Sequence, residues 1–160
     1  AGHKMYKINN MGHIALTVSD IERTIDFYQR VFGFKLTTKR TKEDLDYESF
    51  SEIVGVPGGR FFCAGFDAYG TVIEIVQYHR EGRKEENRTQ NYVGQVHLAF
   101  EVDGDLEELY EHIKNNGAVM LSKSVITVTE GPLKGVRSFH CEDPDGFAFE
   151  FFNSGGSGFH

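Results

Sequence analysis

The stretch His97-Leu98-Ala99-Phe100-Glu101-Val102 decides the fold, because the chain contains the same pattern once before. His13-Ile14-Ala15-Leu16-Thr17-Val18 lies 84 residues earlier and again runs histidine, aliphatic, alanine, large apolar, polar, valine. A second pair of segments repeats in the same order, Gly70-Thr71-Val72-Ile73-Glu74-Ile75-Val76-Gln77 and Gly146-Phe147-Ala148-Phe149-Glu150-Phe151-Phe152-Asn153. Self-similarity of this kind indicates a duplicated structural unit. The sequence therefore predicts two similar modules, each with one histidine and one glutamate at equivalent positions.

Each module is expected to run strand, helix and then three strands. In the first repeat, apolar periodicity predicts a helix at 20–32 and strands at 8–18, 34–40, 60–67 and 71–78. In the second, it predicts a helix at 104–116 and strands at 97–102, 135–141 and 147–153, with two short candidate segments, 119–121 and 125–129, for the remaining strand. This order indicates an α+β fold, in which two βαβββ modules pair into a curved mixed sheet.

The helix ends have sequence signals of their own. Ser19 with Glu22 three residues later has the capping-box pattern, and Gly33 is placed to end the first helix. In the second module, Asp103 is the expected cap and Gly117 the expected end. Gly117 lies 84 residues after Gly33, so the strand and helix are repeated without a change in length.

The repeat also sets the expected domain boundaries. We expect the first module at 7–80, a charged linker at 81–92 and the second module at 93–153, with frayed or cloning-derived ends at 1–6 and 154–160. The first module is the longer one, and its surplus falls at 41–59. Apolar residues in that segment predict a short helix or a lid over a cleft.

Composition excludes several classes of protein. The net charge of −7 argues against nucleic acid or an anionic membrane as a partner, and no apolar run approaches the ~18 residues of a membrane span. No signal-peptide pattern opens the sequence. Cys63 and Cys141 have neither metal-type spacing nor the number that a disulfide framework needs, so a cytoplasmic location is expected.

The two repeated glutamates point to a metal site. Glu74 and Glu150 each lie in the middle of an apolar strand, where an unpaired carboxylate would be unfavourable. Two similar modules usually pack about a pseudo-twofold axis, which would bring His13 and His97 to the same place. Nitrogen and oxygen donors without thiolate suit Zn, Ni, Co, Mn or Fe. The sequence therefore predicts one divalent metal held by His13, Glu74, His97 and Glu150.

These residues resemble the vicinal-oxygen-chelate superfamily, which includes glyoxalases, bleomycin-resistance proteins and extradiol dioxygenases. The resemblance covers about residues 7–153, and the His-Glu-His-Glu set is most similar to glyoxalase I (lactoylglutathione lyase). Gly131-Pro132-Leu133-Lys134-Gly135 and Asp143-Pro144-Asp145-Gly146 also resemble second-module loops of short bacterial glyoxalases.

The resemblance implies a lyase or isomerase that moves a proton next to a carbonyl, with a hemithioacetal-like substrate and an enediolate stabilised by the metal. Glu150 is the expected base, shielded by Phe149, Phe151 and Phe152, and Glu74 is its symmetric counterpart. A homodimer acting on a small molecule is expected. The site could be built within one chain or across two.

The thiol remains open. Short bacterial glyoxalases hold glutathione with an arginine and an asparagine where this chain has Thr17 and Tyr78. Arg60, Tyr47, Tyr78 and Lys134 are the candidate substrate-binding residues, and a solvated surface role is an equal alternative for Arg60.

Other reactions remain open as well. A methylmalonyl-CoA epimerase usually has glutamine at the Glu74 position, and a fosfomycin-type thiol transferase lacks that carboxylate. An extradiol dioxygenase would leave Glu74 as a surplus ligand. A metal-free drug-binding resistance protein would be expected to have lost the four ligands.

Overall fold

The first half of the chain forms a four-stranded sheet with one helix on it. The computed structural model describes residues 5–42, 46–79 and 89–156. The elements of this half are β1 Ile14–Thr17, α1 Ile21–Phe32, β2 Lys35–Arg40, α2 Tyr47–Val54, β3 Phe61–Ala68 and β4 Thr71–Tyr78. The strand order is β1-β4-β3-β2, with β1 parallel to β4 and the other pairs antiparallel.

The second half repeats this topology. Its elements are β5 His97–Glu101, α3 Leu106–Asn115, β6 Val119–Met120, β7 Ile126–Thr127, β8 Arg137–Glu142 and β9 Ala148–Asn153. The order is β5-β9-β8-β6, with β5 parallel to β9 and β7 also pairing with β8. The two mixed sheets and their helices confirm the predicted α+β class. None of the helices in the described ranges is long and apolar enough to cross a membrane.

The first helix begins one residue later than the capping-box pattern suggested. Asp20, not Ser19, is the N-cap, and its side chain accepts a hydrogen bond from the Arg23 backbone N–H. The Ser19 N–H donates instead to Asp145 (3.0 Å), which ties the start of α1 to the other half of the chain. Gly33 ends the helix as predicted, in the left-handed conformation that glycine adopts readily.

The second helix is also shifted from its predicted start. Asp105 caps α3 by accepting from the Glu108 N–H, so Asp103 is not the cap. Gly104, with φ of +94°, turns the chain between the two aspartates, and the helix can begin only after that turn. At the other end Asn116 is the C-cap, and Gly117 follows it with φ of +105°.

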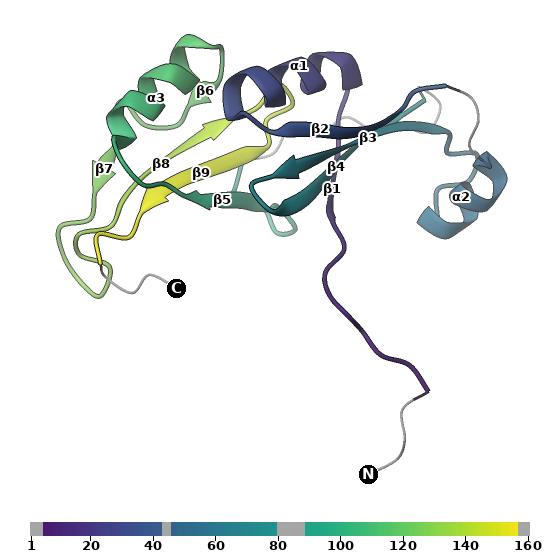
Figure 1. Ribbon diagram of the computed structural model, residues 1–160, viewed down its shortest axis with the longest axis horizontal. Helices are drawn as coiled ribbons and strands as arrows, with labels where there is room; N and C mark the ends of the chain where they lie inside the picture. Colours follow the sequence, from purple (N-terminus) through teal and green to yellow (C-terminus); the bar gives the residue numbers. More distant parts are fainter. Residues whose placement is uncertain (1–4, 43–45, 80–88, 157–160) are drawn as a thin grey trace.

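The first strand is much shorter than the predicted 8–18. Residues 5–13 extend away from the sheets (Figure 1), and Met5, Tyr6, Ile8 and Met11 are exposed there. No strand in the described ranges pairs with this segment, so alternation alone could not make it part of a sheet. The predicted 125–129 strand likewise shortens to the two residues of β7.

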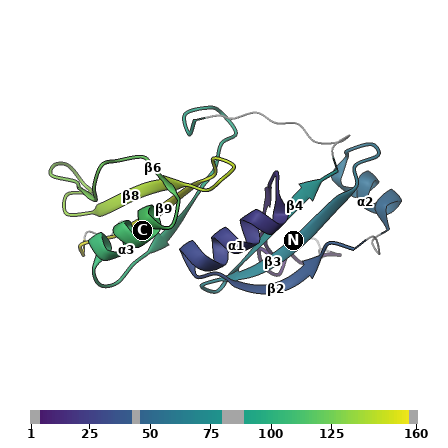
Figure 2. The same ribbon diagram turned by 90° about the horizontal axis from the view of Figure 1, so that it is seen from above.

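The two halves share one hydrophobic core. Helices α1 and α3 lie on the same side of the two sheets (Figure 1), and from above α1 lies beside the second half (Figure 2). Phe32 packs against Phe149 and Phe151, with ring centroids 4.5 and 5.7 Å apart. The Tyr28 hydroxyl donates to the buried Asp143 carboxylate at 2.6 Å. The opposite face of each sheet is therefore free to carry polar residues.

The predicted short helix within 41–59 is present as α2. It lies at the far end of the first sheet (Figure 1), and Phe50 contacts Phe61, with ring centroids 5.7 Å apart. Phe61 clusters with Cys63, Val76 and Tyr78. Alternation along β4 puts this cluster on the face that carries Glu74. Residues 43–45, most of the predicted linker and the extreme ends lie outside the described residues.

Candidate metal and substrate site

The second half brings three metal-type side chains together on one sheet face. In the register, Ala99 pairs with Glu150, and Glu150 pairs with His140 on β8. His97 lies two residues before Ala99, so it projects on the same face as Glu150. The Nε2 atoms of His97 and His140 are each 3.3 Å from the same carboxylate oxygen, Oε2 of Glu150. We call His97, His140 and Glu150 the second-module triad.

Glu150 is the most protected member of the triad. It is 8% exposed although its side chain is a carboxyl group, and the Ser138 hydroxyl donates to its other oxygen, Oε1, at 3.0 Å. Phe149 and Phe151 belong to the core on the helix side, so they do not shield the carboxylate as expected. Alternation leaves Ala148 and Phe152 as the neighbours of Glu150 on its own face.

His140 is held from its outer side. The amide of Gln90 lies 3.2 Å from its Nδ1, and the His97 and His140 rings are 5.0 Å apart. Burial lowers the pKa of His140, and the nearby His97 acts in the same direction, against the opposing effect of Glu150. Both effects favour a neutral imidazole, which is the form that binds metals.

A pocket of about 450 Å³ lies beside the triad. His140, Glu150 and Ser138 contribute polar atoms to it, and its apolar wall includes Leu121, Ile126, Val128 and Leu133. A cavity of this size, with a few convergent polar groups in an apolar lining, is typical of small-molecule sites.

Among the described residues of the first half, two metal-type side chains lie at the equivalent place. Glu74 pairs with Ala15 in the register, and His13 lies two residues before Ala15. The His13 Nε2 is 4.0 Å from Glu74 Oε1, and the two side chains are 50% and 35% exposed. The residue opposite Glu74 on β3 is Gly65, where the second half has His140.

The two histidine–glutamate pairs do not form one cluster. Among residues 5–42, 46–79 and 89–156, the second-module triad is the one group of three or more such side chains with ligand atoms within 4.8 Å of one another. His13 and Glu74 are outside it. The joint binding of one ion by His13, Glu74, His97 and Glu150 stays a prediction.

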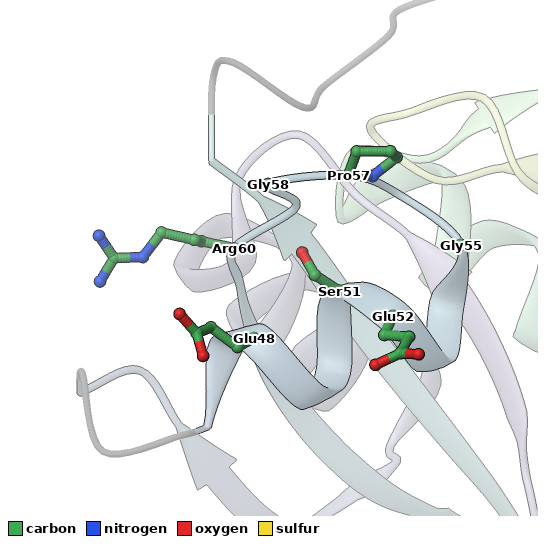
Figure 3. A pocket seen from close by; sticks show the side chains of 7 residues that line it. All are labelled: Glu48, Ser51, Glu52, Gly55, Pro57, Gly58 and Arg60. Carbon is green, nitrogen blue, oxygen red and sulfur yellow. The ribbon is translucent and has the colours of Figure 1, made fainter.

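The candidate substrate-binding residues are scattered. Tyr78 packs in the Phe61 cluster on the Glu74 face, and exposed Lys134 follows Leu133 of the pocket beside the triad. Arg60 lines a separate hollow with Glu48 and Ser51 of α2 (Figure 3). Tyr47 begins α2, but its side chain lies outside the described residues.

Sequence reasoning missed His140, although a signal was present. The turn Asp143-Pro144-Asp145-Gly146 predicts a hairpin, and His140 and Glu150 are equidistant from Asp145. In an antiparallel hairpin, residues equidistant from the centre of the turn face each other. The pairing of His140 with Glu150 follows from that symmetry.

The donors present fit a divalent transition metal. In a tetrahedral site with metal–ligand bonds of 2.0–2.1 Å, neighbouring donor atoms are about 3.3 Å apart. The two Nε2–Oε2 separations of 3.3 Å match this spacing. Imidazole and carboxylate without thiolate suit first-row ions such as Zn, Ni, Co, Mn and Fe.

Comparison with known proteins agrees with this arrangement. Residues 10–151 match the Glyoxalase/Bleomycin resistance protein/Dioxygenase superfamily model. Over 149 residues, the chain is 34% identical to a lactoylglutathione lyase of Escherichia coli O157:H7, covering 91% of this chain and 93% of the relative. A lactoylglutathione lyase of Neisseria meningitidis is also 34% identical, with 87% and 86% covered. The plant enzyme GLX1 of Arabidopsis thaliana is 29% identical, and the match spans only 44% of its length.

Solved structures give the same fold. A glyoxalase family protein from Bacillus cereus has a TM-score of 0.76 at 15% identity, covering 95% of this chain and 98% of that one. The fosfomycin resistance protein FosX from Listeria monocytogenes has a TM-score of 0.62 at 24% identity, with 92% and 94% covered. With the family model matching most of its length, this chain belongs to the Glyoxalase/Bleomycin resistance protein/Dioxygenase superfamily.

Proposed function

We propose that the protein is a metal-dependent lyase or isomerase of the glyoxalase I type, which moves a proton next to the carbonyl of a hemithioacetal-like substrate. The observation that carries the proposal is the Glu150 carboxylate, buried beside a pocket and flanked by two imidazoles. The similarity to lactoylglutathione lyases at 34% identity supports the same reaction class.

The proposed cofactor is one divalent ion, held by His13, Glu74, His97 and Glu150. When bound, such an ion polarises a substrate carbonyl and stabilises the negative charge that develops on its oxygen. Because His13 and Glu74 are outside the second-module triad, we propose a homodimer in which the first-module pair of one chain completes the site of its partner. A FosX structure with Mn(II) shows that a relative of this fold holds a divalent ion.

Glu150 is the proposed general base. The Ser138 hydroxyl fixes its Oε1, which leaves Oε2 directed toward the two imidazoles and the pocket. A base must lie within hydrogen-bond reach of the proton that it removes, and the pocket allows a substrate to approach this carboxylate. Glu74 is more exposed and would act on the other face of the substrate.

The test separates proton transfer from metal binding. Glu150→Gln keeps an oxygen donor but removes the charge that accepts a proton, so kcat should fall by about 10²–10⁴ while metal content falls much less. Glu74→Gln should reduce turnover less for a substrate of one handedness. Glu101→Gln, at the exposed end of β5, is the matched control and should leave kcat unchanged. Full activity of Glu150→Gln with metal bound would rule out this residue as the base.

The substrate thiol is tested first, by assaying methylglyoxal with a panel of thiols. Thr17 and Tyr78 stand where short bacterial glyoxalases use arginine and asparagine to hold glutathione. We therefore expect a thiol other than glutathione to give the higher kcat/KM.

A fosfomycin-type thiol transferase is the second candidate. It is favoured by a 24% identical metallothiol transferase, FosB of Lysinibacillus sphaericus, which matches 90% of this chain. Glu74 argues against it, because that class lacks this carboxylate. Adding a thiol and fosfomycin to the metal-loaded protein and measuring the thiol consumed distinguishes the two reactions.

A further inference from the structure

We propose that His140 is a further ligand of the metal centre, so that three donors for a divalent first-row transition ion, His97, His140 and Glu150, come from the second module. The inference builds on the metal centre of the proposed function, with which it shares His97 and Glu150. It does not depend on which reaction the protein catalyses, because it concerns affinity for the ion alone.

The first support is the convergence of the three donor atoms. His97 and His140 approach one carboxylate oxygen from two different strands, each at 3.3 Å. The three ligand atoms all lie within 4.8 Å of one another. Two histidines and one carboxylate on one side of an ion form a recurring protein metal site that leaves positions open for substrate.

The second support is the set of groups behind the ligands. Metal-binding histidines nearly always have a hydrogen-bond partner on the ring nitrogen that does not face the metal, and metal-binding carboxylates are themselves hydrogen-bonded. Here Gln90 lies at Nδ1 of His140, and Ser138 holds Oε1 of Glu150. In the structure the nearer Gln90 atom is the amide nitrogen Nε2; with the amide turned over, its oxygen would accept from an Nδ1–H and leave the Nε2 lone pair of His140 available to an ion. The Ser138 contact therefore leaves Oε2 of Glu150 facing the two imidazoles, and the Gln90 contact holds the His140 ring from its outer side.

The third support is the contrast between the modules. The first-module position equivalent to His140 is Gly65, and a Cβ there would lie 2.6 Å from the Thr38 hydroxyl oxygen. A side chain at this position of the first module would therefore require Thr38 of β2 to change its rotamer. The third donor is specific to the second module and is no general property of the repeated sheet.

The experiment measures metal affinity and counts the coordinated imidazoles. Metal-free protein is titrated with Co(II), and the bound form is examined by proton NMR for hyperfine-shifted, exchangeable imidazole N–H signals. We expect His140→Ala to raise the Co(II) Kd at least about tenfold. Removing a residue that only hydrogen-bonds to a metal ligand already weakens metal binding by about 10–100-fold, and removing a ligand should weaken it no less. It should also remove one shifted N–H signal. His112→Ala, an exposed histidine on α3, is the matched control and should change neither quantity.

The outcomes separate this inference from the four-ligand centre. If His140→Ala weakens Co(II) binding and removes a signal while His13→Ala does neither, the triad binds the ion alone, and the four-ligand centre is wrong. If both variants weaken binding, the ion has donors from both modules with His140 among them, and the inference and the four-ligand centre both hold. If His13→Ala weakens binding and His140→Ala changes neither readout, the inference is overturned and the proposed function stands. Should His140→Ala fail to fold, His140→Gln is measured in the same way.

Discussion

Replacing Asp143 by Asn should remove the pH dependence that this residue gives to the free energy of unfolding. Asp143 is 3% exposed, and its carboxylate accepts from the Tyr28 hydroxyl and from the backbone N–H groups of Asp145 and Phe147. Burial outweighs these hydrogen bonds and raises the pKa of Asp143 from 3.8 to about 6. Asn at this position can keep every contact. Its oxygen would accept the two backbone hydrogen bonds, and its N–H₂ would donate to the Tyr28 oxygen.

The magnitude follows from the two pKa values. Because the folded-state value is the higher one, the stability that Asp143 contributes is fully present below pH 3.8 and is lost as the pH rises through about 6. The full loss is about 3 kcal/mol, and about 2 kcal/mol of it falls between about pH 4.5 and about pH 7.5. Asn stays neutral throughout, so Asp143→Asn should be the more stable form at the higher pH, by up to about 3 kcal/mol.

The assay is urea unfolding of both proteins at the two pH values. The quantity compared is the difference in unfolding free energy between variant and wild type, in which the titration of all other groups largely cancels. Asp67→Asn, the same substitution at the repeat-equivalent and exposed turn position, measures the effect of Asn in such a turn. A difference that stays constant across this pH range, or an Asn variant that is less stable at the higher pH, would refute the argument. Hydrogen bonding would then dominate over burial.

Further predictions concern the same contacts and the site. Gly65→Ala should lower the free energy of unfolding by about 1–3 kcal/mol, because its Cβ would overlap the Thr38 hydroxyl; thermal unfolding measures this. Tyr28→Phe leaves a buried carboxylate oxygen without its donor and should cost about 1–3 kcal/mol at neutral pH, by urea unfolding. Ser138→Ala frees one oxygen of Glu150 and should weaken Co(II) binding about 10–100-fold, by titration. A metal at a hundredfold excess over Kd should stabilise the wild type by about 2.7 kcal/mol, by thermal shift.

The repeat in the sequence was enough to predict the fold, because alternation and helical periodicity act locally. Alternation put Leu16 and Val18 on the buried face and His13 on the exposed one, as the structure has them. Residues 8–13 were wrongly assigned to a strand, since a strand also needs a partner and no local pattern reveals one. The importance of His140, by contrast, depends on the register of the β8–β9 hairpin, and the symmetry of the 143–146 turn was enough to place it opposite Glu150.

The ring cluster around α1 has a consequence for how the protein folds. A single core contains Phe32 of the first repeat together with Phe149 and Phe151 of the second. Cutting the chain between the repeats would therefore expose aromatic surface on both fragments. We expect neither fragment to be stable alone, a mixture of the two to reassemble, and the intact chain to unfold in one cooperative transition. The unit that was duplicated in the sequence is thus smaller than the unit that folds.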